Sequence, residues 1–123
     1  MLFYTYKTIK TGKAVRPYAL VGFDFCETCA NGGIFEDRDP DSICIRKPGT
    51  YCVMYSLIIQ TDGCVSLYLN GGQVQGSRKN GVERLEGQAY IFLETPGITH
   101  ITIKNCGRKD IQINKGCLVV FAV

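Results

Sequence analysis

Seven cysteines are the residues of this chain whose chemistry first needs an explanation. Cys26 and Cys29 form a Cys-x-x-Cys pair, a spacing found in redox dithiols and in zinc sites. A redox dithiol places its first cysteine at a helix N-terminus, whereas Asn-Gly-Gly closes this segment. A structural zinc ion needs four ligands, and no second Cys-x-x-Cys is present. We therefore expect structural or cross-linking roles for Cys26, Cys29 and Cys106, with a thiol- or metal-dependent role of the Cys26/Cys29 pair as the alternative.

The odd number of cysteines bears on assembly. In an oxidising compartment an odd count leaves at least one thiol for a bond between chains. No classical signal peptide is visible, because residues 1–4 are followed by Thr-Tyr-Lys and not by a long apolar region. That feature favours a reducing compartment, so the sequence leaves the redox state open. Cys52 lies in an apolar run, where we expect it to pack as a small hydrophobic side chain.

A short acidic segment is the second candidate for chemistry. Asp37, Asp39 and Asp41 alternate with Arg and Pro, and a calcium ion prefers several such oxygen ligands. The segment lacks the glycine and the distal glutamate of an EF-hand loop. We expect a solvated acidic turn, with a calcium site at these three residues as the alternative, and no cofactor that the protein requires.

Catalysis finds little support in the sequence. His100 is the single histidine and lies in a strand-like pattern, with no nucleophile motif beside it. No glycine-rich phosphate loop opens a helix. The net charge of +3 comes from a basic N-terminal segment whose basic residues do not continue into an aromatic-laced patch, so we expect a solvated arm and no nucleic-acid partner. The protein is expected not to be an enzyme.

The elements that position these residues are organised around residues 47–70. Pro48-Gly49 predicts a turn, and the apolar, β-branched and aromatic run at 51–59 predicts a strand. Thr61-Asp62-Gly63 predicts a tight turn into a second, alternating strand at 64–69. Asn70-Gly71-Gly72 then gives a strong hairpin signal. Two long strands joined in this way are expected to pair as a central hairpin, which is typical of the middle of a β-sandwich.

The remaining segments predict short strands separated by turn residues every eight to twelve positions, and none shows a helical period with caps. We therefore expect an all-β, antiparallel jelly-roll sandwich of about ten strands. Residues 1–18 are expected to form an N-terminal arm or edge strand, and residues 19–123 the jelly-roll domain. No run of eighteen apolar residues is present, so no membrane span is expected.

The central motifs resemble the C1q/tumour-necrosis-factor-like superfamily. The resemblance lies in a Gly-x-Tyr strand, a second strand ending in Leu-x-x-Asn-Gly and a last strand after a glycine, here at Gly49, Tyr51, Leu67, Asn70, Gly71 and Gly116. Within that superfamily the chain is most similar to the C-terminal heads of bacterial collagen-like spore-surface (exosporium) glycoproteins. The resemblance implies a ten-stranded jelly roll, a tight homotrimer and a surface-exposed binding or structural role.

The apolar strand at 51–59 gives a physical reason for a trimer. Both of its faces are largely apolar, so one fills the core and the other needs a different cover. Aromatic residues and methionine are enriched in subunit interfaces. A cover formed by the chain's own loops is the alternative. The candidates for the trimer interface are Tyr51, Met54, Tyr55, Tyr68 and Phe121.

Together these features predict a non-enzymatic homotrimeric head with a structural or adhesive role on a spore surface or in another extracellular setting, cross-linked by disulfides. Its partners are further copies of itself and other surface or coat proteins. The alternatives are the thiol- or metal-dependent protein described above and a phage or viral receptor-binding head, which shares the fold.

Overall fold

The structure is a computed structural model that describes residues 4–29, 34–36, 39–94 and 96–123. Within them the chain forms ten strands: β1 (Tyr4–Ile9), β2 (Lys13–Val15), β3 (Phe25–Cys29), β4 (Phe35–Glu36), β5 (Ile43–Ile45), β6 (Gly49–Leu69), β7 (Gly72–Gln73), β8 (Lys79–Leu93), β9 (Thr99–Asn105) and β10 (Ile111–Ala122). No helix among the described residues has the length and apolar character to cross a membrane. The expected all-β architecture is confirmed.

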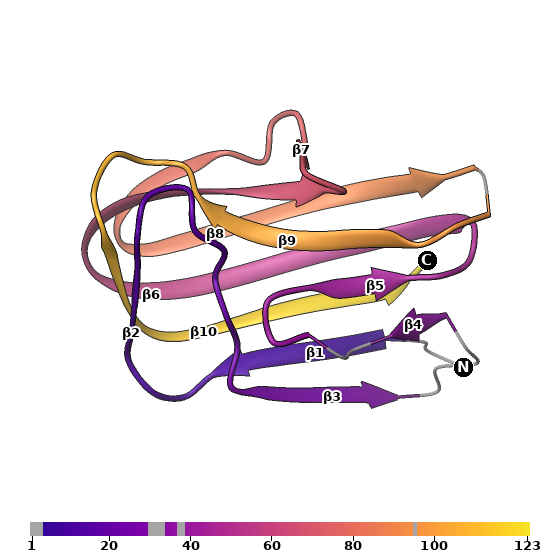
Figure 1. The fold of residues 1–123 in the computed structure, drawn as a ribbon, viewed down its shortest axis with the longest axis horizontal. Coiled ribbons are helices and arrows are strands. Elements are labelled where there is room, and N and C mark those ends of the chain that lie inside the picture. Colours follow the sequence, from indigo (N-terminus) through magenta and orange to yellow (C-terminus); the bar gives the residue numbers. More distant parts are fainter. Residues whose placement is uncertain (1–3, 30–33, 37–38, 95) are drawn as a thin grey trace.

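The strands form one antiparallel sheet that folds over into two layers (Figure 1). The order along the sheet is β3-β1-β10-β6-β9-β5-β4, with β8 and β7 paired to β6 and β2 paired to β10. The first layer holds β3, β1, β10, the first half of β6 and the second half of β8. The second layer holds the second half of β6, the first half of β8, β9, β5 and β4.

Strand β6 changes layers at residues 59–63. Figure 1 shows it running to one end of the molecule, curling over and returning. Its register with β8 shifts between Ile58 and Asp62, which marks a β-bulge, and bulges bend a strand. The sequence predicts a tight turn between two strands that pair with each other. The direction does reverse here, but both halves pair with β8, so the predicted hairpin is wrong.

The turn predicted at Asn70-Gly71-Gly72 is confirmed. Strands β6 and β7 pair around it, with Leu69 opposite Gly72. Asn70 has a φ of 48° and Gly71 a φ of 84°. A type I′ hairpin turn needs positive φ at both central positions, and asparagine and glycine adopt it at the lowest cost.

Strand β1 lies inside the sheet. It pairs with β10 on one side and with β3 on the other, so this part of residues 1–18 is not an edge strand, whereas β2 in the same range pairs, among the described strands, with β10 alone. Lys7 on this strand is not solvated either, since only 2% of its surface is exposed. Its ammonium group donates to the carbonyl oxygen of Asp39 at 2.6 Å. A buried charge is tolerated when it is hydrogen-bonded in this way.

The core lies between the two layers. Each strand directs alternate side chains inward, because successive side chains of a strand point to opposite faces. Among the described residues, the apolar side chains at 0% exposure are Val21, which precedes β3, and a set from β5, β6, β9 and β10: Ile43, Ile45, Val53, Leu57, Val65, Leu67, Ile101, Ile103, Ile113, Leu118 and Val120. Full burial of each such side chain contributes about 1.5–3 kcal/mol of transfer free energy.

Asp24 fixes the connection between β1 and β2 against the segment that enters β3. Its carboxylate accepts hydrogen bonds from the backbone N–H groups of Lys10 at 3.0 Å and Thr11 at 3.2 Å. The ammonium group of Lys13 lies 2.5 Å from the same carboxylate. These contacts, with the Lys13 side chain as the largest cause, hold the pKa of Asp24 well below its usual value of 3.8.

Replacing Asp24 by asparagine tests this contact through its pH dependence. Because the pKa of Asp24 is lower in the folded than in the unfolded chain, its stabilising contribution is present above pH 3.8 and is lost as the pH falls towards the folded pKa. We expect the urea midpoint of the native chain to fall more steeply between about pH 4 and pH 2 than that of Asp24→Asn. Parallel curves for the two proteins would contradict the assignment.

Replacing Gly87 by alanine tests the packing between β8 and β6. A Cβ at Gly87 would lie 2.6 Å from Cζ of the buried Tyr55 ring, closer than atoms pack. We expect a loss of roughly 1–3 kcal/mol in unfolding free energy, measured by urea denaturation, because the ring cannot move without disturbing the core. Gly22→Ala is the matched control, since no atom lies within 4 Å of the position that its added methyl group would take. An equal effect of both substitutions would contradict the packing.

Candidate interaction surface

The outer side of the first layer collects apolar side chains from four strands. The strand register places Tyr4, Phe121, Cys52 and Tyr90 in one row across β1, β10, β6 and β8. The next row along the strands holds Tyr6, Val119, Met54 and Gln88. We call the apolar part of this surface the open face and define it by Tyr4, Tyr6, Met54, Tyr90, Phe92, Val119 and Phe121.

Much of the open face is exposed in a single chain. Phe92 is 70% exposed, Tyr90 57% and Met54 39%, while Tyr6, Val119 and Phe121 are half-buried. Large apolar side chains that stand together in this way mark interaction surfaces, whereas scattered ones do not. An open groove of about 520 Å³ borders the open face between β8 and β10, and Met54 and Val119 are among the residues that line it.

The same layer becomes polar towards the end where β6 curls over. There the rows continue with Ser56 opposite Glu86, and with Ile58 between Lys115 and Arg84. The Ser56 hydroxyl donates to the Glu86 carboxylate at 3.5 Å, and the Arg84 guanidinium lies 3.3 Å from the same carboxylate. The layer therefore has an apolar end and a charged end. Protein interfaces have a similar arrangement, with an apolar centre and a polar rim.

Two of the five predicted interface residues lie on the open face, and two others do not. Met54 and Phe121 face outward there. Tyr51 and Tyr55 point into the core, where only 2% and 3% of their surfaces are exposed. Alternation along a strand separates its two faces but does not say which face is inside, and the structure turns both tyrosines inward.

The buried tyrosines satisfy their hydroxyl groups within the chain. Tyr51 donates to the carbonyl of Lys47 at 2.7 Å and packs edge-to-face on Phe35 at 6.0 Å between ring centroids. Tyr55 donates to the carbonyl of Ser77 at 3.2 Å. Burial raises the pKa of both tyrosines, because the phenolate form loses its hydration. They act as core residues of the single chain.

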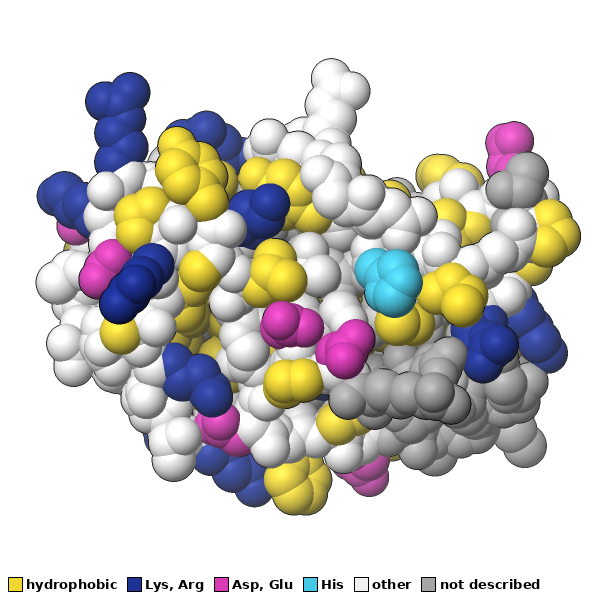
Figure 2. All heavy atoms as spheres, in the orientation of Figure 1, with side chains coloured by type: hydrophobic (Ala, Val, Ile, Leu, Met, Phe, Trp, Pro, Cys, Tyr) yellow, Lys and Arg dark blue, Asp and Glu magenta, His cyan; other side chains and the backbone are white. Residues whose placement is uncertain are grey.

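Tyr68, the fifth predicted interface residue, lies on the second layer. It pairs with Thr102 of β9, and the ammonium group of Lys104 lies 4.5 Å from its ring centroid. Around Tyr68 the outward positions of this layer are largely polar, since Ser66 lies opposite Lys104 and Tyr68 opposite Thr102. Figure 2 shows this side of the molecule, where hydrophobic side chains are interspersed with charged and polar ones.

The Cys-x-x-Cys pair lies on β3, at one end of the sheet order. Cys26 is exposed and pairs in register with Lys7, and Cys29 is the last residue of the strand, its side chain outside the described part of the structure. Positions three apart on a strand lie on opposite faces. This backbone does not bring the two positions to one ligand site, as a helical turn or a loop would.

Cys106 lies beside Cys64 in the folded chain. The two sulfur atoms are 2.8 Å apart, and the N–H of Cys106 donates to the carbonyl of Cys64 at 3.1 Å. Burial, followed by the contact with Cys64, raises the pKa of Cys106 to about 11. The residues are 42 positions apart in the chain, so no local pattern signals their contact.

The structure also brings Cys44 and His100 together across β5 and β9. The sulfur of Cys44 lies 3.1 Å from Nδ1 of His100, and the backbone N–H of His100 donates to the side-chain oxygen of Asn70 at 2.8 Å. The histidine, cyan in Figure 2, is exposed, whereas Cys44 is buried. No local sequence pattern links His100 to this thiol, because 56 residues separate them.

The acidic segment is described in part. Asp37 lies outside the described residues. The carboxylate of Asp39 accepts a hydrogen bond from the Ser42 hydroxyl at 3.4 Å, and its backbone carbonyl accepts from Lys7. Among the residues that the structure describes, no three His, Cys, Asp or Glu side chains are grouped for a metal ion. A calcium site at Asp37, Asp39 and Asp41 stays a prediction.

Solved structures of other proteins share this fold. No protein-family model matches the chain, and no curated protein sequence does. The globular domain of zebrafish complement 1qA protein matches with a TM-score of 0.71 and 12% identity, over 98% of this chain and 97% of that one.

Two further solved structures also share the fold of this chain. Murine APRIL matches with a TM-score of 0.63 and 11% identity over the whole of both chains. The PRD1 vertex protein P5 matches with a TM-score of 0.58 and 13% identity, over 98% of this chain and 96% of that one. At such identities the likeness shows the fold, which is the expected C1q/tumour-necrosis-factor-like jelly roll.

Thiol labelling tests where the cysteines lie. We expect iodoacetamide to modify Cys26 at least about tenfold faster than Cys52 and Cys64 in the native protein, because a reagent must reach the sulfur. Burial also raises the pKa of Cys52, which lowers its thiolate fraction. Peptide mass spectrometry over time measures the three rates, and urea is the control in which they converge. Equal rates in the native protein would contradict the burial of β6.

Proposed function

We propose that this chain is the head domain of a homotrimer that assembles through its open face and has a structural or adhesive role, without enzymatic activity. The observation that carries the proposal is the apolar surface on one side of the first layer, where Met54, Tyr90 and Phe92 are exposed and Val119 and Phe121 are half-buried. The C1q/tumour-necrosis-factor-like fold supports it, since resemblance to that superfamily implies a tight homotrimer.

The two layers of the sheet differ in the character of their outer sides. On the second layer Thr102 and Lys104 face outward, which is the polar side of an ordinary half-exposed sheet. On the first layer, six of the eight positions in the two rows described above are aromatic, aliphatic or methionine, and the other two are Cys52 and Gln88. Burial of apolar area contributes about 25 cal/mol per Å², so a surface of this kind favours association. Tyrosine, phenylalanine and methionine are the residues enriched at subunit interfaces.

The charged end of the same layer limits how copies can meet. Glu86 and Arg84 form an ion pair there, and Lys115 lies in the same row as Arg84. Charged groups are costly to bury unless each finds a partner. The contact between copies is therefore centred on the aromatic end, around Tyr90 and Phe121, with the charged end at its rim.

The setting that we propose for this head is a spore or cell surface, where other surface or coat proteins are its partners. This part of the proposal rests on the resemblance to the heads of spore-surface glycoproteins. A phage receptor-binding head is the second candidate, favoured by the fold shared with the PRD1 vertex protein P5. A thiol- or metal-dependent protein using Cys26 and Cys29 is less favoured, because β3 places the two positions on opposite faces of a strand.

The test of the trimer is the native chain compared with Met54→Arg. By light scattering after size exclusion we expect a native mass of three times the 13.6 kDa of one chain, with and without reductant. Met54→Arg places an unpaired charge in the contact, which costs roughly 3–5 kcal/mol and weakens association by about two orders of magnitude or more. The variant is therefore expected to elute as a folded single chain.

Val82→Arg is the matched control. Val82 is a 68% exposed apolar residue in the part of β8 that pairs with the second half of β6, away from the open face. We expect this variant to keep the native mass. A native chain that stays monomeric at all concentrations, or a Met54→Arg variant that keeps the native mass, would overturn the proposal. Circular dichroism confirms that each variant retains its β-structure.

A further inference from the structure

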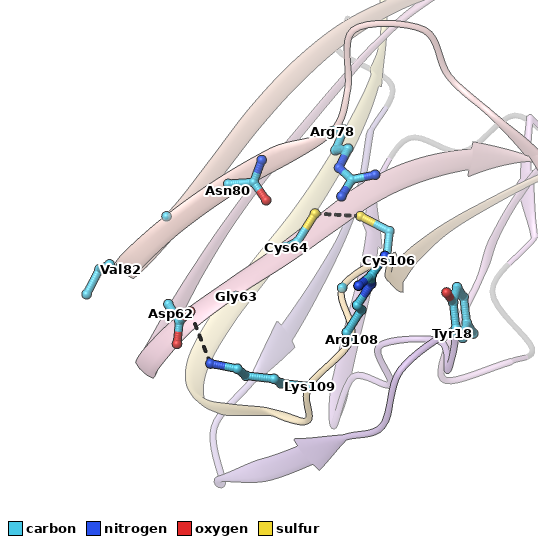
Figure 3. Close-up of a pocket in the computed structure, with 12 residues that line it drawn as sticks. Tyr18, Asp62, Gly63, Cys64, Arg78, Asn80, Val82, Cys106, Arg108 and Lys109 are labelled. Carbon is cyan, nitrogen blue, oxygen red and sulfur yellow. Dashed lines mark hydrogen bonds and ion pairs between the residues drawn. The ribbon is translucent and has the colours of Figure 1, made fainter.

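A cleft of about 690 Å³ on the second layer holds a pair of thiols that the proposed assembly does not use. Cys64 lies in the second half of β6, and Cys106 directly follows β9. Figure 3 shows Arg78 and Arg108 on either side of the two sulfur atoms, and Lys109 directed towards Asp62. None of the residues that line this cleft belongs to the open face.

The backbone holds the two cysteines as neighbours on adjacent strands. Val65 pairs with Asn105 in the register of β6 and β9, so Cys64 and Cys106 form the next pair along. The N–H of Cys106 donates to the Cys64 carbonyl at 3.1 Å, which fixes their separation. Paired residues of antiparallel strands have Cα atoms about 4.5–5.5 Å apart, within the range of about 4.4–6.8 Å that a disulfide spans.

The side chains already point at each other. Their sulfur atoms are 2.8 Å apart, and a covalent disulfide is about 2.04 Å long, so a small rotation closes the gap. Asn105 holds the connecting loop in place, because its side chain donates to the carbonyl of Lys109 at 2.8 Å and accepts from the N–H of Gly107 at 2.9 Å. We propose that Cys64 and Cys106 form a reversible intrachain disulfide, a thiol–disulfide exchange site whose oxidant is a small disulfide molecule.

The exchange proceeds in two balanced steps. The thiol of Cys106, the more exposed of the pair, loses its proton and attacks a sulfur of the small disulfide, whose S–S bond breaks. A mixed disulfide forms on Cys106, and the departing thiolate takes up a proton. The second protein thiol then loses its proton and displaces the bound half, so that the Cys64–Cys106 bond forms and a second small thiol leaves. Two electrons pass from the protein to the small disulfide, which is reduced to two thiols.

The charges around the pair select the kind of oxidant. Arg78, Arg108 and Lys109 line the cleft with Asp62 as the single acidic residue among its lining residues, and that carboxylate is 3.8 Å from the Lys109 ammonium group. The cleft is therefore net positive, which raises the local concentration of an anionic reagent. A disulfide that carries carboxylates, such as oxidised glutathione, fits this charge.

The Cys64–Cys106 bond would join two neighbouring parts of the second layer that a backbone hydrogen bond already connects. It would tie β6, just beyond its curl, to the loop between β9 and β10. Cross-linking residues that are distant in sequence lowers the entropy of the unfolded chain. The oxidised protein is therefore expected to melt on the order of 10 °C above the reduced protein.

The test is to treat the reduced native protein with oxidised glutathione and to map its disulfides. We expect a linked pair of peptides that contain Cys64 and Cys106, a loss of two hydrogen atoms in mass for this pair, and the rise in melting temperature. Dithiothreitol should reverse all three. Folded protein in which these cysteines remain thiols, carry glutathione only, or join other cysteines would overturn the proposal.

Two variants separate this bond from general oxidation. Cys106→Ser removes one sulfur, and we expect oxidised glutathione to leave its melting temperature unchanged. Cys117→Ser is the matched control, since Cys117 is half-buried like Cys106 but lies on β10 of the first layer, and it should keep the full rise. A rise that persists in Cys106→Ser would contradict the assignment. Because the mapping uses the native chain, the test stands even where a variant folds poorly.

Discussion

The continuous hydrogen bonding of β6 is the constraint on which the rest of the structure depends. Its first half lies between β10 and β8, and its second half between β9 and β8, so one strand belongs to the middle of both layers. Because buried backbone groups must be paired, each half needs two neighbours, and this requirement draws segments from both ends of the chain to β6. The bulge near Ile58 and Asp62 permits the curl without ending the strand.

This arrangement also explains why one side of the molecule is left uncovered. The two layers bury the inward side chains of β6 and β10 against each other, among them Leu57 and Leu118. No described segment crosses the outer side of the first layer, where Met54 and Tyr90 stand exposed. A sheet that is apolar on both sides buries one side in the core and, in a single chain, leaves the other surface exposed to water. The proposed trimer hides it, and the cleft on the other layer stays accessible.

The sequence predicted the local features of the fold well. The positive φ values of Asn70 and Gly71 follow from residue type alone, and the alternation in β6 and β9 follows from period-two burial. The positions of Tyr51 and Tyr55 were not predictable in the same way, because alternation groups them with Val53 and Leu57 but does not assign that group to the core. The interior position of β1 depends on its pairing with β10, and the paired residues of these two strands are more than 100 positions apart in the sequence.

By itself, the sequence determined that the chain is an all-β antiparallel domain with apolar residues on both faces of its central strand. It also limited the chemistry to cysteines, one histidine and an acidic segment. The tertiary structure decided which apolar face is inside and which is open. It also decided which of these groups meet: Cys64 with Cys106, and Cys44 with His100. The physical reason is that turn and strand preferences act over a few residues, whereas register between strands joins residues 42 to 56 positions apart, and only the packed sheet fixes that register.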